Sequence, residues 1–204
     1  MTTPLTVTAP AQPRPVAAHE TARIAELLRD RFTIRIISEL ADFGPIPTRQ
    51  TSAALPDIPA ASAQSVLRSL RRRQLIACRY EAGRRVYETT AAGDALGDVY
   101  DSLARWARGH DFPTANAAFI RRVDATLALL ADTELVTQLT SGYGEYRAQP
   151  AVATPPAALL KAQLADHAGR EGYQLTETGV SLRRALAELH AWIHSHAALL
   201  PAPR

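Results

Sequence analysis

The sequence predicts a mainly α-helical protein with two small β-hairpin wings, each followed by one long helix. Three observations predict this fold class. Apolar residues recur at helical spacing over most of the chain. Short runs rich in branched and aromatic residues flank a glycine-containing turn, as in a hairpin. Residues 87–110 also correspond to residues 173–196 at a constant offset (173 − 87 = 86), which indicates an internal duplication.

Residues 1–19 are expected to form a disordered tail. They are rich in threonine and proline and have no apolar core, so they lack the pattern of a signal peptide. No apolar run in the chain is long enough to cross a membrane. The sequence has one cysteine, Cys78, which excludes an intramolecular disulfide framework. These features predict a cytoplasmic protein with no membrane partner.

Three helices are predicted before residue 60. Residues 20–30 and 32–43 each carry an apolar stripe at helical spacing. Gly44 and Pro45 then end the second helix, because neither residue favours its continuation. A short supporting helix is expected over residues 48–55.

The next stretch is predicted to form a helix, a hairpin and a further helix. Residues 60–73 contain neither glycine nor proline. They follow Pro59, which suits the start of a helix because its missing N–H would be unpaired there. Residues 75–80 and 85–90 are predicted to be two strands, and residues 91–108 an amphipathic helix. A helix followed by a two-stranded hairpin is the arrangement of a winged helix.

Charge is concentrated in this part of the chain. Seven arginines fall within residues 68–85, where Glu81 is the one acidic residue. Up to His110 the chain has 15 basic and 11 acidic residues, whereas the rest has 8 and 9. An arginine-rich helix alone is often only a solvated basic face. Beside a hairpin, its guanidinium groups suit phosphates on both sides of a groove, which predicts double-stranded DNA as the partner.

The predicted DNA contacts lie on this helix and hairpin. Gln64 and Ser65 are the candidate base readers, because they stand near the start of the helix. The full predicted set is Gln64, Ser65, Arg68, Arg71, Arg72, Arg79, Arg84 and Arg85, in which Arg68, Arg71, Arg72 and Arg84 are the phosphate contacts.

Residues 20–110 resemble the HxlR-type winged helix-turn-helix regulators. The resemblance is carried, in order and spacing, by RFTIRIISEL at 31–40, LPDI at 55–58, LRSL with LI at 67–76 and YETTAAG at 87–93. It implies a small dimeric bacterial transcription factor with a recognition helix in the major groove and a wing on the backbone. The last helix of such a domain helps to form the dimer. Ala60, Ala61 and Ala63 stand where the family usually has arginine and glutamine, so weak base readout is expected.

The second half, residues 117–200, is predicted to be a degenerate winged-helix repeat. Leu96, Leu103, Trp106 and His110 correspond to Leu182, Leu189, Trp192 and His196, and Gly83-Arg84 to Gly169-Arg170. Residues 159–167 are predicted to form the first strand of the second hairpin. Three prolines lie within residues 145–158, and each costs about 3 kcal/mol or more inside a helix, so this copy is expected to have lost its recognition helix.

The two long helices suggest tandem repeats that form an intrachain pseudo-dimer. In dimers of such regulators equivalent helices of two chains pack together, and a fused duplication satisfies one helix with the other. The sequence leaves open whether two chains still associate as a homodimer. It predicts a DNA-binding transcriptional regulator and identifies neither the operator, nor any ligand that modulates it, nor the sign of regulation.

A second interpretation is a repurposed protein that binds or transforms a small hydrophobic or aromatic molecule. Its candidate ligand-binding residues are Tyr100, Trp106, Tyr143, Tyr146 and Trp192, which would line a cavity between the repeats. Aromatics at helical spacing are more often part of a core. A third interpretation is a protein-interaction module without a ligand.

Metal binding and catalysis have little support in the sequence. His190 and His194 are spaced for one helix face, but with His196 they lie beside an apolar stripe and no further ligand is indicated. Solvated histidines are the simpler interpretation. No nucleophile, base and acid form a recognisable set. We therefore predict no metal site, no cofactor and no catalytic residues, and an enzyme is the less favoured alternative.

Overall fold

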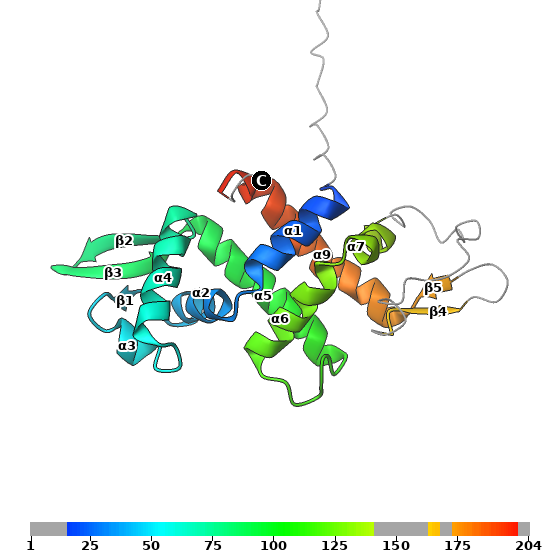
Figure 1. Cartoon of the computed structure of the whole chain (residues 1–204), viewed down its shortest axis with the longest axis horizontal. Coiled ribbons are helices and arrows are strands. Elements are labelled where there is room, and N and C mark those ends of the chain that lie inside the picture. The colour runs from blue at the N-terminus through cyan, green and yellow to red at the C-terminus, as the bar shows by residue number, and fades with distance from the viewer. Residues whose placement is uncertain (1–15, 141–162, 168–172, 200–204) are drawn as a thin grey trace, which may run out of the picture.

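The computed structural model describes residues 16–140, 163–167 and 173–199, and Figure 1 shows their arrangement. The described part is mainly helical with small antiparallel sheets, as the sequence predicts. None of its helices is long and apolar enough to span a membrane. In chain order the elements are α1 (Ala18–Leu28), α2 (Arg31–Phe43), β1 (Ile46–Pro47), α3 (Thr51–Ala54), α4 (Ala60–Arg72), β2 (Ile76–Glu81), β3 (Arg84–Thr89), α5 (Ala91–Gly109), α6 (Phe119–Leu130), α7 (Thr133–Thr140), β4 (Ala165–His167), β5 (Tyr173–Leu175) and α9 (Glu177–His196), followed by a 3₁₀ turn (Ala197–Leu199).

The supporting helix is shorter than the sequence suggests. It was expected over residues 48–55, but α3 is confined to Thr51–Ala54. Residues 48–50 instead form a turn that follows β1, in which the Thr48 N–H donates to the Arg85 carbonyl of β3 at 2.9 Å. The other predicted elements of the first half lie within two residues of their observed bounds. Helix α1 begins at Ala18, within the range 1–19 of the predicted tail, and residues 1–15 of that range lie outside the described part.

The first sheet has the strand order β1-β3-β2 and is antiparallel throughout. In the hairpin, Glu81 pairs with Arg84, so the connecting turn has two residues. Both have positive backbone angles, with φ of 46° at Ala82 and 77° at Gly83. This geometry matches the twist of the two strands, and glycine adopts it without steric cost. The hairpin projects from the rest of the molecule at the left of Figure 1.

Helix α5 begins at a tightly packed junction with the base of the hairpin. The Thr90 hydroxyl donates to the Gln74 carbonyl at 2.6 Å and accepts the Gly93 N–H at 3.2 Å, which caps the helix. The Thr90 N–H donates to the Leu75 carbonyl at 3.1 Å. A Cβ atom on Gly93 would lie only 2.1 Å from that same carbonyl oxygen. Glycine is therefore required for this close approach.

Helix α5 also lies at the centre of the core, where it packs against α2, α6 and α9 (Figure 1). Its Tyr100 is fully buried, and the phenol donates to the Leu28 carbonyl at the end of α1 at 3.0 Å. Burial raises the pKa of Tyr100 well above its usual range, so the phenol keeps the proton that it donates. Although α1 is the first helix of the chain, it packs against three helices of the second half, α6, α7 and α9.

The junction before α9 has the same local geometry as the junction before α5. The Thr176 hydroxyl donates to the Gln163 carbonyl at 2.8 Å and accepts the Gly179 N–H at 3.2 Å. A Cβ atom on Gly179 would lie 2.2 Å from the Leu164 carbonyl oxygen. Gln74 and Gln163 also share a left-handed backbone, with φ of 54° and 55°.

This equivalence corrects the predicted register of the second hairpin. Leu164 occupies the position of Leu75, an offset of 89 residues (164 − 75), whereas Thr176 and Thr90 are offset by 86 (176 − 90). The ungapped correspondence thus ends at the hairpin, which is three residues shorter in the second half. Within residues 159–167, strand β4 occupies only Ala165–His167. Gly169-Arg170 and residues 145–158 lie outside the described part.

Candidate nucleic-acid interface

Helix α4 has one buried face and one exposed face. Ala63, Leu67 and Leu70 are 3%, 1% and 0% exposed and face the core, in contact with α2 and β2. Their spacing places them on one stripe of the helix. The opposite surface exposes five of the predicted DNA contacts: Gln64, Ser65, Arg68, Arg71 and Arg72. Packing of the apolar stripe therefore fixes which side chains α4 presents to a partner.

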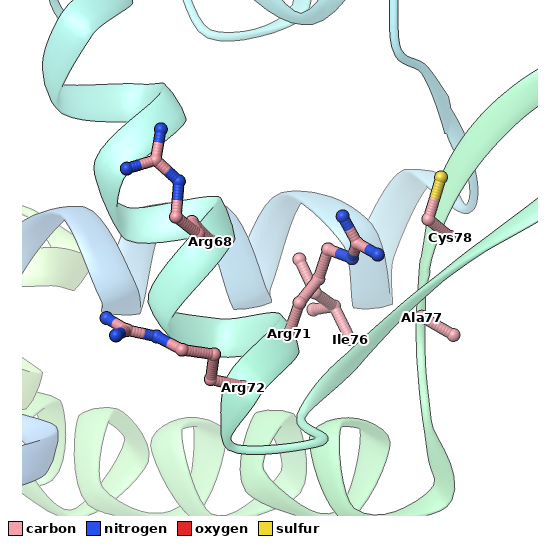
Figure 2. A pocket seen from close by; sticks show the side chains of 6 residues that line it. All are labelled: Arg68, Arg71, Arg72, Ile76, Ala77 and Cys78. Carbon is pink, nitrogen blue, oxygen red and sulfur yellow. The ribbon is translucent and has the colours of Figure 1, made fainter.

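The three arginines of this set, Arg68, Arg71 and Arg72, line a hollow of about 420 Å³ between α4 and β2, which we call the arginine groove (Figure 2). Its remaining lining comes from Ile76, Ala77 and Cys78 of β2. Figure 2 shows Arg71 extending from α4 toward the strand that carries Cys78, whereas Arg72 extends to the other side of the helix. The arginine groove thus joins the two elements that the sequence assigns to DNA.

The positive charge at the arginine groove is not neutralised by the described parts of the chain. No described carboxylate forms an ion pair with Arg68, Arg71 or Arg72. The first turn of α4 carries no acidic residue. Three exposed guanidinium groups therefore stand together with their charge available to an external anion.

The wing contributes unequal arginines. Arg84 and Arg85 begin β3 and are exposed, and the Arg85 guanidinium lies 6.0 Å from the centroid of the Tyr80 ring. Arg79 instead donates to Glu88 and, at 3.4 Å, to Glu81. These two carboxylates neutralise the positive charge of Arg79, so Arg79 is a weaker candidate for a phosphate contact than sequence alone suggested.

Tyr80 was not among the predicted contacts. Its side chain is 73% exposed, although tyrosine usually buries much of its ring. The alternation of β2 puts Tyr80 on the same face as Ile76 and Cys78, which line the arginine groove. That alternation is the signal in the sequence that could have identified it.

The predicted base-reading end of α4 is only partly accessible. Ala60 and Ala61 are exposed in the first turn, and Gln64 and Ser65 in the next. Ala63 is 3% exposed and packs in the core, so its small size serves packing rather than contact with DNA.

The aromatic residues of the alternative interpretation divide into two groups. Tyr143 and Tyr146 lie outside the described residues. Tyr100, Trp106 and Trp192 are buried core residues, at 0%, 7% and 3% exposure. Their polar atoms already bond to protein groups, since each tryptophan Nε1 and the tyrosine hydroxyl donate to a main-chain carbonyl. No described polar group in this set is left for a small molecule.

The three histidines of α9 have different surroundings. His190 Nε2 lies 2.9 Å from the Thr21 hydroxyl of α1, and His196 Nδ1 lies 3.1 Å from the Trp192 carbonyl oxygen. His194 is exposed. Among the residues that the structure describes, no three histidine, cysteine, aspartate or glutamate side chains are grouped to hold a metal ion.

Comparison with known proteins bears on the half that contains the arginine groove. No curated protein and no solved structure matches the chain. Residues 27–113, from the end of α1 to just beyond α5, match the family model described as HxlR-like helix-turn-helix. This confirms the predicted resemblance over that region. Residues 27–113 are thus similar to an HxlR-like helix-turn-helix, and this similarity suggests a DNA-binding transcription regulator.

Proposed function

We propose that this protein is a cytoplasmic transcription regulator that binds double-stranded DNA through α4 and the β2-β3 wing. The observation that carries the proposal is the arginine groove, where Arg68, Arg71 and Arg72 are exposed and no described carboxylate pairs with them. Each phosphate that a guanidinium neutralises releases counterions, which favours binding most strongly at low salt. The exposed Arg84 and Arg85 extend this basic surface onto the wing.

The same surface supports limited sequence readout. Glutamine can pair with adenine in the major groove, and a serine hydroxyl accepts several partners, so Gln64 and Ser65 are the proposed base contacts. The exposed methyl groups of Ala60 and Ala61 offer only apolar contact, for example with thymine. We expect sequence preference to be modest and affinity to come mainly from phosphate contacts.

The second half is proposed to be a degenerate winged-helix repeat that pairs with the first half as an intrachain pseudo-dimer. The matched junctions at Thr90 and Thr176 support this origin, since both combine a threonine cap with a glycine against a leucine carbonyl. We do not extend the proposal to a small-molecule site, because the described aromatic residues bond within the core.

The experiment is a fluorescence-anisotropy titration of labelled duplex DNA with arginine variants. Arg72→Ala should weaken binding to all duplexes alike and reduce the slope of log K against log salt by about 1. Arg79→Ala should have a smaller effect, because Glu88 and Glu81 match its charge. Arg184→Ala, an exposed arginine on α9, is the matched control.

Three results would count against the assignment of this surface. One is a salt slope that Arg72→Ala leaves unchanged. Another is an equal loss of affinity for Arg72→Ala and Arg184→Ala, which would mean that general basicity rather than the arginine groove determines binding. The third is the absence of binding by the unaltered protein at low salt.

A further inference from the structure

We propose that a single chain engages a single DNA half-site in a 1:1 complex, because α9 occupies the place on α5 that a second subunit would otherwise take. The choice of DNA as the ligand in this inference rests on the proposed DNA-binding function. Its assembly claim rests on contacts between the two halves.

The first of these contacts is a reciprocal pair of tryptophan hydrogen bonds. Trp106 Nε1 on α5 donates to the Thr178 carbonyl in the first turn of α9 at 3.2 Å. Trp192 Nε1 on α9 donates to the Ala92 carbonyl in the first turn of α5 at 2.9 Å. The two tryptophans are 86 residues apart (192 − 106), and so are the two acceptors (178 − 92). The late part of each helix thus contacts the start of the other, as around a local twofold axis.

The surroundings of the tryptophans repeat the same relation. Trp106 lies 5.5 Å from the His110 ring, and Trp192 lies 5.5 Å from the His196 ring, measured between ring centroids. The two hairpins lie at opposite ends of the molecule in Figure 1, as expected for two copies related by an axis between α5 and α9.

One departure from this symmetry has a simple chemical cause. Ser181 Oγ accepts from Trp106 Nε1 at 3.1 Å and lies 2.8 Å from His110 Nε2. The residue 86 positions earlier is Ala95, which has no hydroxyl. His196 therefore has no such partner, and its Nδ1 lies against the Trp192 carbonyl instead.

The apolar face of α5 is already covered inside one chain. Leu96, Leu103 and Trp106 are 0%, 0% and 7% exposed, and Leu189 and Trp192 of α9 are 0% and 3% exposed. A second chain could reach this face only by displacing α9.

The described surface offers no substitute interface. Its large exposed apolar side chains are Phe43 at the end of α2, Tyr80 on the wing and Val180 on α9, which lie on separate elements. A standard interface buries about 800 Å² per partner with a contiguous apolar centre. Three separated side chains do not supply that centre.

Charge and sequence indicate one DNA-binding surface in each chain, formed by α4 and the β2-β3 wing. Residues 1–110 have 15 basic and 11 acidic residues, whereas residues 111–204 have 8 and 9. At the 89-residue offset of Leu164 from Leu75, the segment that corresponds to α4 is residues 149–161 (60 + 89 to 72 + 89), and it contains Pro150, Pro155 and Pro156. Proline does not suit a helix interior. Dimeric helix-turn-helix regulators read two half-sites about one helical turn apart. A chain with one DNA-binding surface and an internal partner therefore needs only one half-site.

The test measures mass in solution by size-exclusion chromatography with light scattering. The 204-residue chain alone should have the mass of one chain, 22.1 kDa, across the accessible concentration range. With a short duplex of the tightest-binding sequence from an in vitro selection, the complex should contain one chain. A duplex with two such sites about 10 base pairs apart should bind two chains independently, without cooperativity. Arg72→Ala should weaken the complex and leave the mass of the free chain unchanged.

The outcomes separate this inference from the proposed function. A free chain with twice the monomer mass overturns the internal-partner claim, whether or not DNA binds. Two chains on a single site, or strongly cooperative filling of paired sites, overturns the half-site claim while DNA binding itself stands. A monomer that binds no duplex at low salt contradicts the proposed function and removes the half-site claim with it.

Discussion

At the residue scale, the tightest constraint lies at the two glycines that follow the threonine caps. Gly93 and Gly179 each place their α-carbon against a carbonyl oxygen, of Leu75 and Leu164 respectively. A methyl group there would meet main-chain atoms, which cannot rotate away as a flexible side chain can. The same close approach occurs in both halves, which is the most local feature that they share.

This geometry leads to a prediction for stability. Gly93→Ala and Gly179→Ala should each lower the free energy of unfolding by about 2 to 3 kcal/mol, because the backbone must move to accept the new Cβ atom. Gly109→Ala is the matched control, since its Cβ would have no neighbour within 4 Å, and it should change stability by less than about 0.5 kcal/mol. Urea unfolding midpoints measure all three. Equal midpoints for Gly93→Ala and Gly109→Ala would contradict the packing described for α5.

Individual contacts were predictable where local rules determine them. The turn at Ala82 and Gly83 fixes the hairpin register, and this register puts Glu88 near Arg79 on one face of the wing. The neutralised charge of Arg79 could thus have been deduced from sequence. The partner of Trp192 could not, because the Ala92 carbonyl is 100 residues away and no local rule brings the two together.

At the element scale, helix α1 connects the two halves. It continues from the first half onto α6, α7 and α9, and Arg29 at its end forms an ion pair with Asp124 of α6 at 3.0 Å. Near its start, Thr21 is fully buried and contacts His190 of α9. Burial lowers the pKa of His190 below its ordinary value of 6.5, so the folded protein favours the neutral ring.

The lowered pKa of His190 predicts how stability depends on pH. Above about pH 6.5 the ring is neutral in both states, and His190 does not favour unfolding. As the pH falls below 6.5, the unfolded chain takes up a proton that the folded protein binds less readily, so stability decreases. His190→Gln should therefore reduce the loss of thermal stability between pH 7 and pH 5.

The matched control for this measurement is the exposed His194 on the same helix. The loss of melting temperature on acidification should be smaller for His190→Gln than for His194→Gln. If His190→Gln loses as much stability on acidification as the unaltered protein does, the buried contact with Thr21 does not affect folding in this pH range.

The elements differed in how well their sequences specify them. Helices α2, α4 and α5 were predicted closely because each has an apolar stripe and a clear boundary signal. Examples are Gly44 at the end of α2 and Thr90 at the start of α5. The first strand of the second hairpin was predicted over residues 159–167, whereas β4 occupies Ala165–His167, because an ungapped comparison cannot detect a shorter hairpin. Helix α3 was predicted too long because the hydrogen bond from Thr48 to β3 is a tertiary contact.

At the scale of the whole molecule, the described structure separates one basic surface from an interior that joins the two halves. Helix α4 and the β2-β3 wing, which line the arginine groove, lie at one end, and the second hairpin lies at the other (Figure 1). Arg122 holds the connection between the halves, since its buried guanidinium donates to the Ala107, Phe112, Ala115 and Ala117 carbonyls. Composition predicted the uneven charge, but it could not show how tightly the halves are joined.

DNA binding through α4 and the wing is tested most directly by the salt dependence of binding by the unaltered protein. Five exposed arginines, Arg68, Arg71, Arg72, Arg84 and Arg85, are proposed to contact phosphates. With about 0.9 counterion released per contact, log K should fall against log salt with a slope of about −4 to −5. That slope would support binding through α4 and the wing. A slope near zero, or no binding even at low salt, would contradict it.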